Sequence, residues 1–167
     1  MEEVVVRTDI YAPPDEVFAF LRSFTNYAEY SEYLTDVSAF GDGGPGTQYE
    51  LTASWWRINY RARTEVTAID PPERIAWRVV DVIDADGIWQ LEPIENGTRV
   101  TLRIAFDAST ADRGAVRLPR FVSIGWVIDR VSPLVHREAE AIVKRIVTDL
   151  EGAPRDVDLE ITVDRAA

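Results

Sequence analysis

A long apolar stripe lies near the C-terminus of the chain. Apolar residues recur three or four positions apart from 128 to 150, which builds one face of an α-helix. Ser132 can cap this helix, Pro133 suits its first turn, and Gly152 suits a left-handed residue just after its end. We therefore predict a helix over 132–152. The stripe consists of Ile128, Val131, Val135, Ala139, Ile142, Ile146 and Leu150.

The segments before this helix alternate apolar and polar residues, as strands with one wet face do. Asn96-Gly97 marks a hairpin, because both residues tolerate positive φ. Residues 84–87 are predicted to form the turn before a strand that carries Trp89. Seven strands are expected, which together would form a curved antiparallel sheet gripping the helix. They cover 3–11, 35–40, 47–55, 58–68, 75–79, the region of Trp89 and Leu91, and 99–106.

Two short helices are predicted between the first two strands. The first opens after the Pro13-Pro14 pair, and the second is capped by Asn26 and carries a row of tyrosines. That row could contact a ligand or form a half-buried packing face with wet hydroxyl groups. The glycine-rich stretch 41–47 lacks the Gly-Lys-Ser/Thr ending of a phosphate-binding loop and is predicted to connect strands.

Two further segments lie outside this pattern. Residues 108–121 break the alternation and suit a loop, which could move as a lid or be passive. Residues 155–164 alternate again, and they indicate either a disordered tail or an added strand. Such a strand would pair with a sheet edge of this chain or of a second subunit. The second arrangement would form a homodimer through the C-terminal strand.

Composition narrows the function classes. The net charge of −11 over 167 residues repels phosphate backbones and anionic lipids, so we expect no nucleic-acid partner. Lys144 is the one lysine, and an acidic, lysine-poor surface indicates adaptation to concentrated salt or, alternatively, a genome rich in arginine codons. No cysteine, signal peptide or membrane segment is evident, so we expect a cytoplasmic protein without disulfides or thiol nucleophiles.

A series of short motifs resembles the START-like SRPBCC superfamily, and within it the polyketide cyclase/dehydrase and coenzyme Q-binding branch. The motifs are IYAPPDEVFAFL at 10–21, the tyrosine-rich helix, the glycine-rich loop, PERIAW at 72–77, GTRVTL at 97–102 and PLVHR at 133–137. The resemblance covers nearly residues 4–151. It implies an α+β helix-grip fold, in which a seven-stranded sheet wraps the C-terminal helix around an apolar cavity. We accordingly assign 1–152 to one domain and 153–167 to an extension that departs from the pattern.

This fold serves both carriers and enzymes, so the residues must decide between them. We predict binding or transport of a hydrophobic small molecule, such as a lipid, isoprenoid quinone or polyketide-like compound, without a permanent cofactor. The alternatives are a cyclase or dehydratase and an interaction domain with a collapsed cavity. Large inward side chains could fill a core or form ligand walls. The candidate ligand-binding residues are Leu51, Trp55, Tyr60, Trp77, Trp89, Leu102, Phe106, Val127, Val131 and Val135.

The chain offers few groups for catalysis. His136 is its one histidine, and no Gly-x-Ser-x-Gly segment accompanies it, so we do not expect a nucleophilic triad. His136, Tyr60 and Glu138 could serve as acid and base in ring closure or dehydration if they reached the cavity. Glu138 more readily forms an ion pair with Arg145. The acids Asp81, Asp84 and Asp86 could hold a cation, although solvated side chains at a turn of so acidic a protein explain them better.

Overall fold

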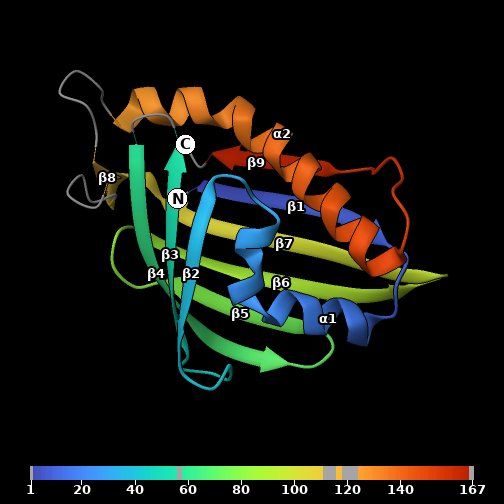
Figure 1. Ribbon diagram of the computed structural model, residues 1–167. Helices are drawn as coiled ribbons and strands as arrows, with labels where there is room; N and C mark the ends of the chain where they lie inside the picture. The colour runs from blue at the N-terminus through green and yellow to red at the C-terminus, as the bar shows by residue number, and fades with distance from the viewer. Residues whose placement is uncertain (1, 56–57, 111–115, 118–123, 166–167) are drawn as a thin grey trace.

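Within the described residues, the chain forms one curved sheet, three short helical segments and one long helix (Figure 1). The computed structural model describes residues 2–55, 58–110, 116–117 and 124–165, and of these it describes the backbone alone at 55, 58, 108, 116–117, 124–136 and 165. The strands are β1 (Glu2–Ile10), β2 (Leu34–Phe40), β3 (Gln48–Trp55), β4 (Ile58–Asp70), β5 (Arg74–Val79), β6 (Asp84–Ile94), β7 (Gly97–Asp107), β8 (Val116–Arg117) and β9 (Glu160–Arg165). The helices are α1 (Pro14–Arg22), α2 (Ile124–Glu151) and the 3₁₀ segments η1 (Phe24–Glu29) and η2 (Ala108–Thr110).

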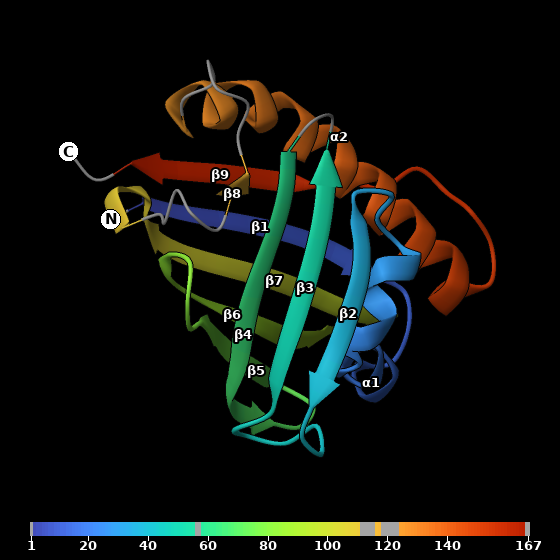
Figure 2. The same cartoon turned by 60° about the vertical axis from the view of Figure 1, so that its left-hand side comes forward.

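Neighbouring strands of the sheet are antiparallel. Within the described residues, eight strands follow one another in the order β2-β3-β4-β5-β6-β7-β1-β9, and β8 pairs with β4. β2, β3 and β4 run crosswise to the other strands (Figure 2). The pairing of β4 with β5 shifts between Val66 and Ala68, which is the kind of irregularity that bends a strand. The sheet is therefore strongly curved, and its concave face can receive a helix.

The long helix α2 lies across the concave side of the sheet, and α1 and η1 cover one end (Figure 1). This arrangement confirms the predicted helix-grip fold, with two short helical segments after the first strand. Gly152 has a φ of +86°, and its N–H donates to the Thr148 carbonyl at 3.0 Å, so the helix ends where the sequence predicts. No helix in the described part of the chain is both long and apolar enough to span a membrane.

Three local predictions are wrong. The helix begins at Ile124 rather than after Ser132, so Pro133 lies in its interior. Proline costs the helix one backbone hydrogen bond there, but the apolar face continues upstream of Ser132, and its packing outweighs that cost. The second short helix is a 3₁₀ segment that Ser23 precedes, so Asn26 does not cap it. Residues 84–87 are the start of β6, not a turn. Residue 84 pairs with β7 alone, and residues 85–87 pair with both β5 and β7.

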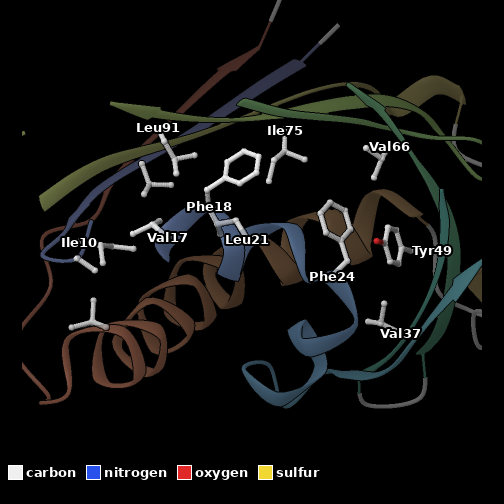
Figure 3. Packing of buried hydrophobic residues seen from close by; sticks show 13 residues of the cluster. Ile10, Val17, Phe18, Leu21, Phe24, Val37, Tyr49, Val66, Ile75 and Leu91 are labelled. Carbon is white, nitrogen blue, oxygen red and sulfur yellow. The ribbon is translucent and has the colours of Figure 1, made fainter. Parts of the chain in front are cut away.

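An apolar cluster fills the space between the short helices and the sheet (Figure 3). Phe18 of α1 points toward Ile75 of β5, and Val17 and Ile75 have no exposed surface. Phe24 of η1 stacks on Tyr49 of β3, with ring centroids 4.7 Å apart. The first segment after β1 thus fills part of the concave face of the sheet.

The C-terminal segment extends the sheet within the same chain. β9 pairs antiparallel with β1 from Glu2↔Arg165 to Arg7↔Glu160. The tail predicted at 155–164 therefore contains a strand, and it covers the edge that β1 would otherwise expose. A homodimer through β9 stays a prediction. The segment 108–121, predicted as a lid or passive loop, lies largely outside the described residues.

Candidate ligand-binding cavity

An apolar cavity of about 350 Å³ lies between the sheet and the C-terminal half of α2. Small-molecule sites usually have about 300–1,000 Å³, so this volume is enough for a small ligand. The lining side chains come from β1, β6 and β7 on the sheet side and from α2 on the other, with α1, η1 and the residues up to Leu34 at one end. The cavity therefore occupies the part of the grip that the apolar cluster leaves unfilled.

The sheet wall follows from strand alternation and register. Val6 and Trp89 are both paired with Leu102, and Thr8 is paired with Val100, so all five residues share the concave face. Each of these side chains lines the cavity. An unbroken apolar surface results, with the Trp89 indole as its largest member.

The helix wall is the middle of the predicted apolar stripe. Ala139, Ile142, Val143 and Ile146 line the cavity, and they lie three or four residues apart on α2. Val147, one position further, has no exposed surface and belongs to the core cluster. One helix face thus anchors the core and encloses the cavity.

Two tyrosines of the predicted tyrosine row reach the cavity wall. Burial raises the pKa of Tyr27, and its hydroxyl donates to the Leu21 carbonyl. The hydroxyl of Tyr30 donates to Asp149 Oδ2 at 2.6 Å, and burial, followed by this hydrogen bond and the nearby negative charges, raises the pKa of Tyr30 to about 12. Both phenols are therefore protonated at neutral pH and serve as hydrogen-bond donors, not bases.

The predicted ligand-binding residues divide into three groups. Trp89 and Leu102 line the cavity, and their contact with a ligand stays a prediction. The side chains of 55, 127, 131 and 135 lie outside the described part of the chain. The four others, which are not among the residues that line this cavity, are Leu51, Tyr60, Trp77 and Phe106.

Two of these four residues have environments of their own. Trp77 packs over Gly87, where an added Cβ would lie 2.2 Å from the indole ring, and its Nε1 is buried without a hydrogen-bond partner among the described residues. Burial and the charge of Asp81 raise the pKa of Tyr60 to about 12.

Sequence reasoning missed most of the cavity wall, although its signals were present. Val6, Thr8 and Ile10 belong to the alternating first strand, and Ala139 and Ile142 belong to the helical stripe. Those patterns identify a buried face, but they do not distinguish residues that fill a core from residues that border a cavity.

The catalytic candidates do not assemble at this cavity. Tyr60 and Glu138 are absent from its described lining, and the side chain of His136 lies outside the description. Glu138 Oε1 lies 3.9 Å from Arg145 Nη1, so the predicted ion pair is present. Tyr27 and Tyr30 are the ionisable side chains among the described lining residues.

The described residues also provide no cluster suited to a metal. No group of three or more histidine, aspartate or glutamate side chains among them could hold an ion. Asp81, one of the acids considered above, instead accepts the backbone N–H groups of Arg63 and Val82 at 3.0 and 2.9 Å.

A second depression of about 540 Å³ lies beside β1 and the tail, and it is polar. Two of its three arginines form ion pairs: Arg99 Nε lies 2.9 Å from Asp9 Oδ1, and Arg155 Nε lies 2.8 Å from Glu151 Oε1. Mutual neutralisation leaves little charge to attract a ligand, so the smaller apolar cavity is the stronger candidate site.

A curved antiparallel sheet that grips a C-terminal helix over an apolar cavity defines the START-like class of domains. The family model described as "Polyketide cyclase / dehydrase and lipid transport" matches residues 1–151, and the chain belongs to that family. The match ends where α2 ends, so β9 lies beyond it. A search of curated proteins gives no significant match.

Solved structures share the fold at low sequence identity. The Zhui aromatase/cyclase from Streptomyces sp. R1128 is 16% identical with a TM-score of 0.69, covering 90% of this chain and 94% of that one. A protein from Thermus thermophilus is 19% identical with a TM-score of 0.67, covering 90% and 97%. A START superfamily protein from Mycobacterium smegmatis is 15% identical with a TM-score of 0.62, covering 91% and 99%. These similarities extend to the fold alone.

Proposed function

We propose that the protein binds a hydrophobic small molecule in the cavity between the sheet and α2, as a carrier. The observation that supports this proposal is the apolar cavity of about 350 Å³. Its wall combines an aromatic ring, Trp89, with branched aliphatic side chains from the sheet and from the helix. Such walls bind apolar ligands because they remove apolar surface from water.

The protonation states of the side chains that line the cavity favour a carrier over an enzyme. Acid–base catalysis at neutral pH needs a group whose pKa lies near 7. Tyr27 and Tyr30 are the ionisable groups of the described lining, and their pKa values are raised away from neutrality. A cyclase or dehydratase would need a group from elsewhere in the chain. An interaction domain with a collapsed cavity is disfavoured by the cavity itself.

Binding can be tested with N-phenyl-1-naphthylamine, an uncharged dye whose fluorescence rises in apolar surroundings. We expect saturable fluorescence enhancement with the purified full chain, and its displacement by lipids or quinones. Native mass spectrometry of protein from its own host would identify a ligand that co-purifies. The proposed function would be refuted if the dye did not bind and the native mass spectrum showed the mass of the protein without a ligand.

Two alanines of α2 give a matched pair of variants. Ala139 lines the cavity, whereas Ala141 is half-buried and is not among the described lining residues. In Ala139→Phe the phenyl ring should occupy the cavity and weaken dye binding by about tenfold or more, whereas Ala141→Phe should stay within about twofold of the parent. Circular dichroism of both variants checks that each is folded. An equal loss of dye affinity in both variants would show that the dye binds outside this cavity.

We also propose that the protein works in a salt-rich cytoplasm. The net charge of −11 produces self-repulsion that cations screen. The free energy of unfolding should therefore rise between low and molar potassium chloride. A flat dependence would leave codon usage as the explanation of the low lysine content.

A further inference from the structure

Two hydroxyl groups of the inner cavity wall are already bonded within the protein. Thr8 Oγ1 donates to the Asp158 carbonyl at 2.9 Å, although the Thr8 side chain lines the cavity. The Tyr27 hydroxyl donates to the Leu21 carbonyl. Each hydroxyl has a single hydrogen to donate, so neither is available as a donor to a ligand. A ligand carbonyl or ether oxygen that reaches this inner region therefore finds no donor in Thr8 or Tyr27, and a ligand hydroxyl meets only oxygens that are already hydrogen-bonded.

The outer end of the cavity differs in one respect. Tyr30 and Ser31 line it there, and the Tyr30 hydroxyl donates to Asp149. Ser31 Oγ accepts the N–H of Tyr33 at 3.3 Å. Among the described residues, no acceptor is recorded for the hydrogen of the Ser31 hydroxyl, so this group can still bond to a ligand.

The charges around this end are mainly negative. Glu29 and Asp149 lie close enough to Tyr30 for their charges to contribute to its raised pKa. Arg145 supplies a positive charge, but its guanidinium donates to the Tyr30 carbonyl and pairs with Glu138. An anionic head group at this end would therefore be repelled, and salt would weaken that repulsion.

We infer that the ligand buries a hydrocarbon body without hydrogen-bonding groups and places a single uncharged polar group beside Ser31. This inference rests on the proposed function and specifies its ligand class. A polyketide-like compound, with several carbonyl groups along its length, would lose hydration at the inner wall without gaining hydrogen-bond donors from Thr8 or Tyr27. A fatty acid would bring its carboxylate to the acidic end. Long-chain alcohols and compounds with one neutral polar end satisfy both conditions.

Three compounds of equal chain length separate these requirements: 1-decanol, 1,10-decanediol and decanoate. Each is titrated against the full chain loaded with N-phenyl-1-naphthylamine at neutral pH. We expect 1-decanol to displace the dye best and the diol to be weaker by about tenfold, because its second hydroxyl loses its hydration and finds no free donor at the inner wall. Decanoate should be weaker than 1-decanol at low salt, and this difference should shrink at high salt.

A matched pair of serine variants tests the position of the polar end. Ser31→Ala should weaken 1-decanol by about threefold to tenfold through loss of one hydrogen bond. The control is Ser38→Ala on β2, since the Ser38 hydroxyl donates to Asp36 and does not line the cavity. This control should bind 1-decanol like the parent.

Particular outcomes would overturn the inference. Equal or tighter binding of the diol would show that the inner wall accepts polar groups, and preferred binding of decanoate would show that the mouth accepts an anion. Equal affinity of Ser31→Ala and the parent for 1-decanol would remove Ser31 from the site. In all three cases ligand binding itself survives. Failure of both the dye and 1-decanol to bind would instead refute the proposed function.

Discussion

Arg155 ties the C-terminal segment to the body of the fold. Its Nε and Nη2 donate to the Glu151 carboxylate at 2.8 and 2.9 Å, and Nη2 also donates to the Asp9 carbonyl at 2.9 Å. The guanidinium carbon lies 4.4 Å from the centre of the Tyr11 ring. One side chain thus joins the end of α2, the end of β1 and the segment that leads into β9.

The cost of Arg155→Ala can be worked out from these contacts. A hydrogen bond to a charged group contributes about 1.5–3 kcal/mol when well shielded, and an exposed cation–π contact about 0.5–1 kcal/mol. The side chains of Arg155 and Glu151 are 27% and 11% exposed, so solvent screens part of each term. Because the terms also overlap on one group, we expect a loss of about 2–3 kcal/mol in the free energy of unfolding.

Arg74→Ala is the matched control for this variant. Arg74 makes two hydrogen bonds to Asp70 at 2.8 and 2.6 Å, in another pair four residues apart, but these side chains are 48% and 55% exposed. Its loss should cost about 0–1 kcal/mol. Urea unfolding measures both variants, and hydrogen exchange of the β9 amides should accelerate in Arg155→Ala alone. Equal destabilisation of the two variants, or unchanged β9 exchange, would refute this account of the tail.

Three other variants probe the remaining contacts. Gly87→Ala should cost about 1–3 kcal/mol, because the new Cβ would lie 2.2 Å from the Trp77 ring, and adding Trp77→Leu should recover much of the loss in urea unfolding. Thr98→Val should cost about 1–3 kcal/mol, because the fully buried Thr98 hydroxyl donates to the Ala12 carbonyl at 2.8 Å, whereas Thr98→Ser should cost less. Hydrogen bonds from its arginine partner lower the pKa of Glu151, so its contribution is present above the unfolded pKa of about 4.3 and disappears as pH falls through the folded pKa. Urea unfolding from acid to neutral pH should thus show the destabilisation of Glu151→Gln at neutral pH only.

The sequence predicts the elements of this fold well because most of them bury one face. Apolar residues alternate with polar ones along a strand and recur every three or four positions along α2. Both patterns indicate which face is buried, so the sheet and the helix could be predicted without the structure. The start of α2 could not. Ser132 and Pro133 form a good local start signal, yet the helix begins at Ile124, because local capping preferences are smaller than the packing of a continuous apolar face.

The cavity was harder to locate than the fold. Strand alternation identifies the inward positions of β3, β5, β6 and β7, but it does not distinguish those that fill the core from those that line the cavity. The difference arises from α1 and η1, whose Phe18 and Phe24 fill part of the space before the concave face (Figure 3). Leu51, Trp77 and Trp89 all pack against this cluster, but of the three Trp89 alone also lines the cavity. Their roles therefore depend on tertiary packing that single-strand patterns do not contain.

Thr8 shows how the tail contributes to the character of the cavity. It is the polar member of an otherwise apolar inward series on β1, and a free hydroxyl there would give a ligand a hydrogen-bonding partner. The carbonyl of Asp158, beyond the family match, accepts the hydrogen of that hydroxyl. Since the hydrogen of this hydroxyl is occupied, the C-terminal extension removes a donor from the inner wall that the family segment alone would leave free. In the proposed carrier, the extension would thus affect ligand selection through the wall.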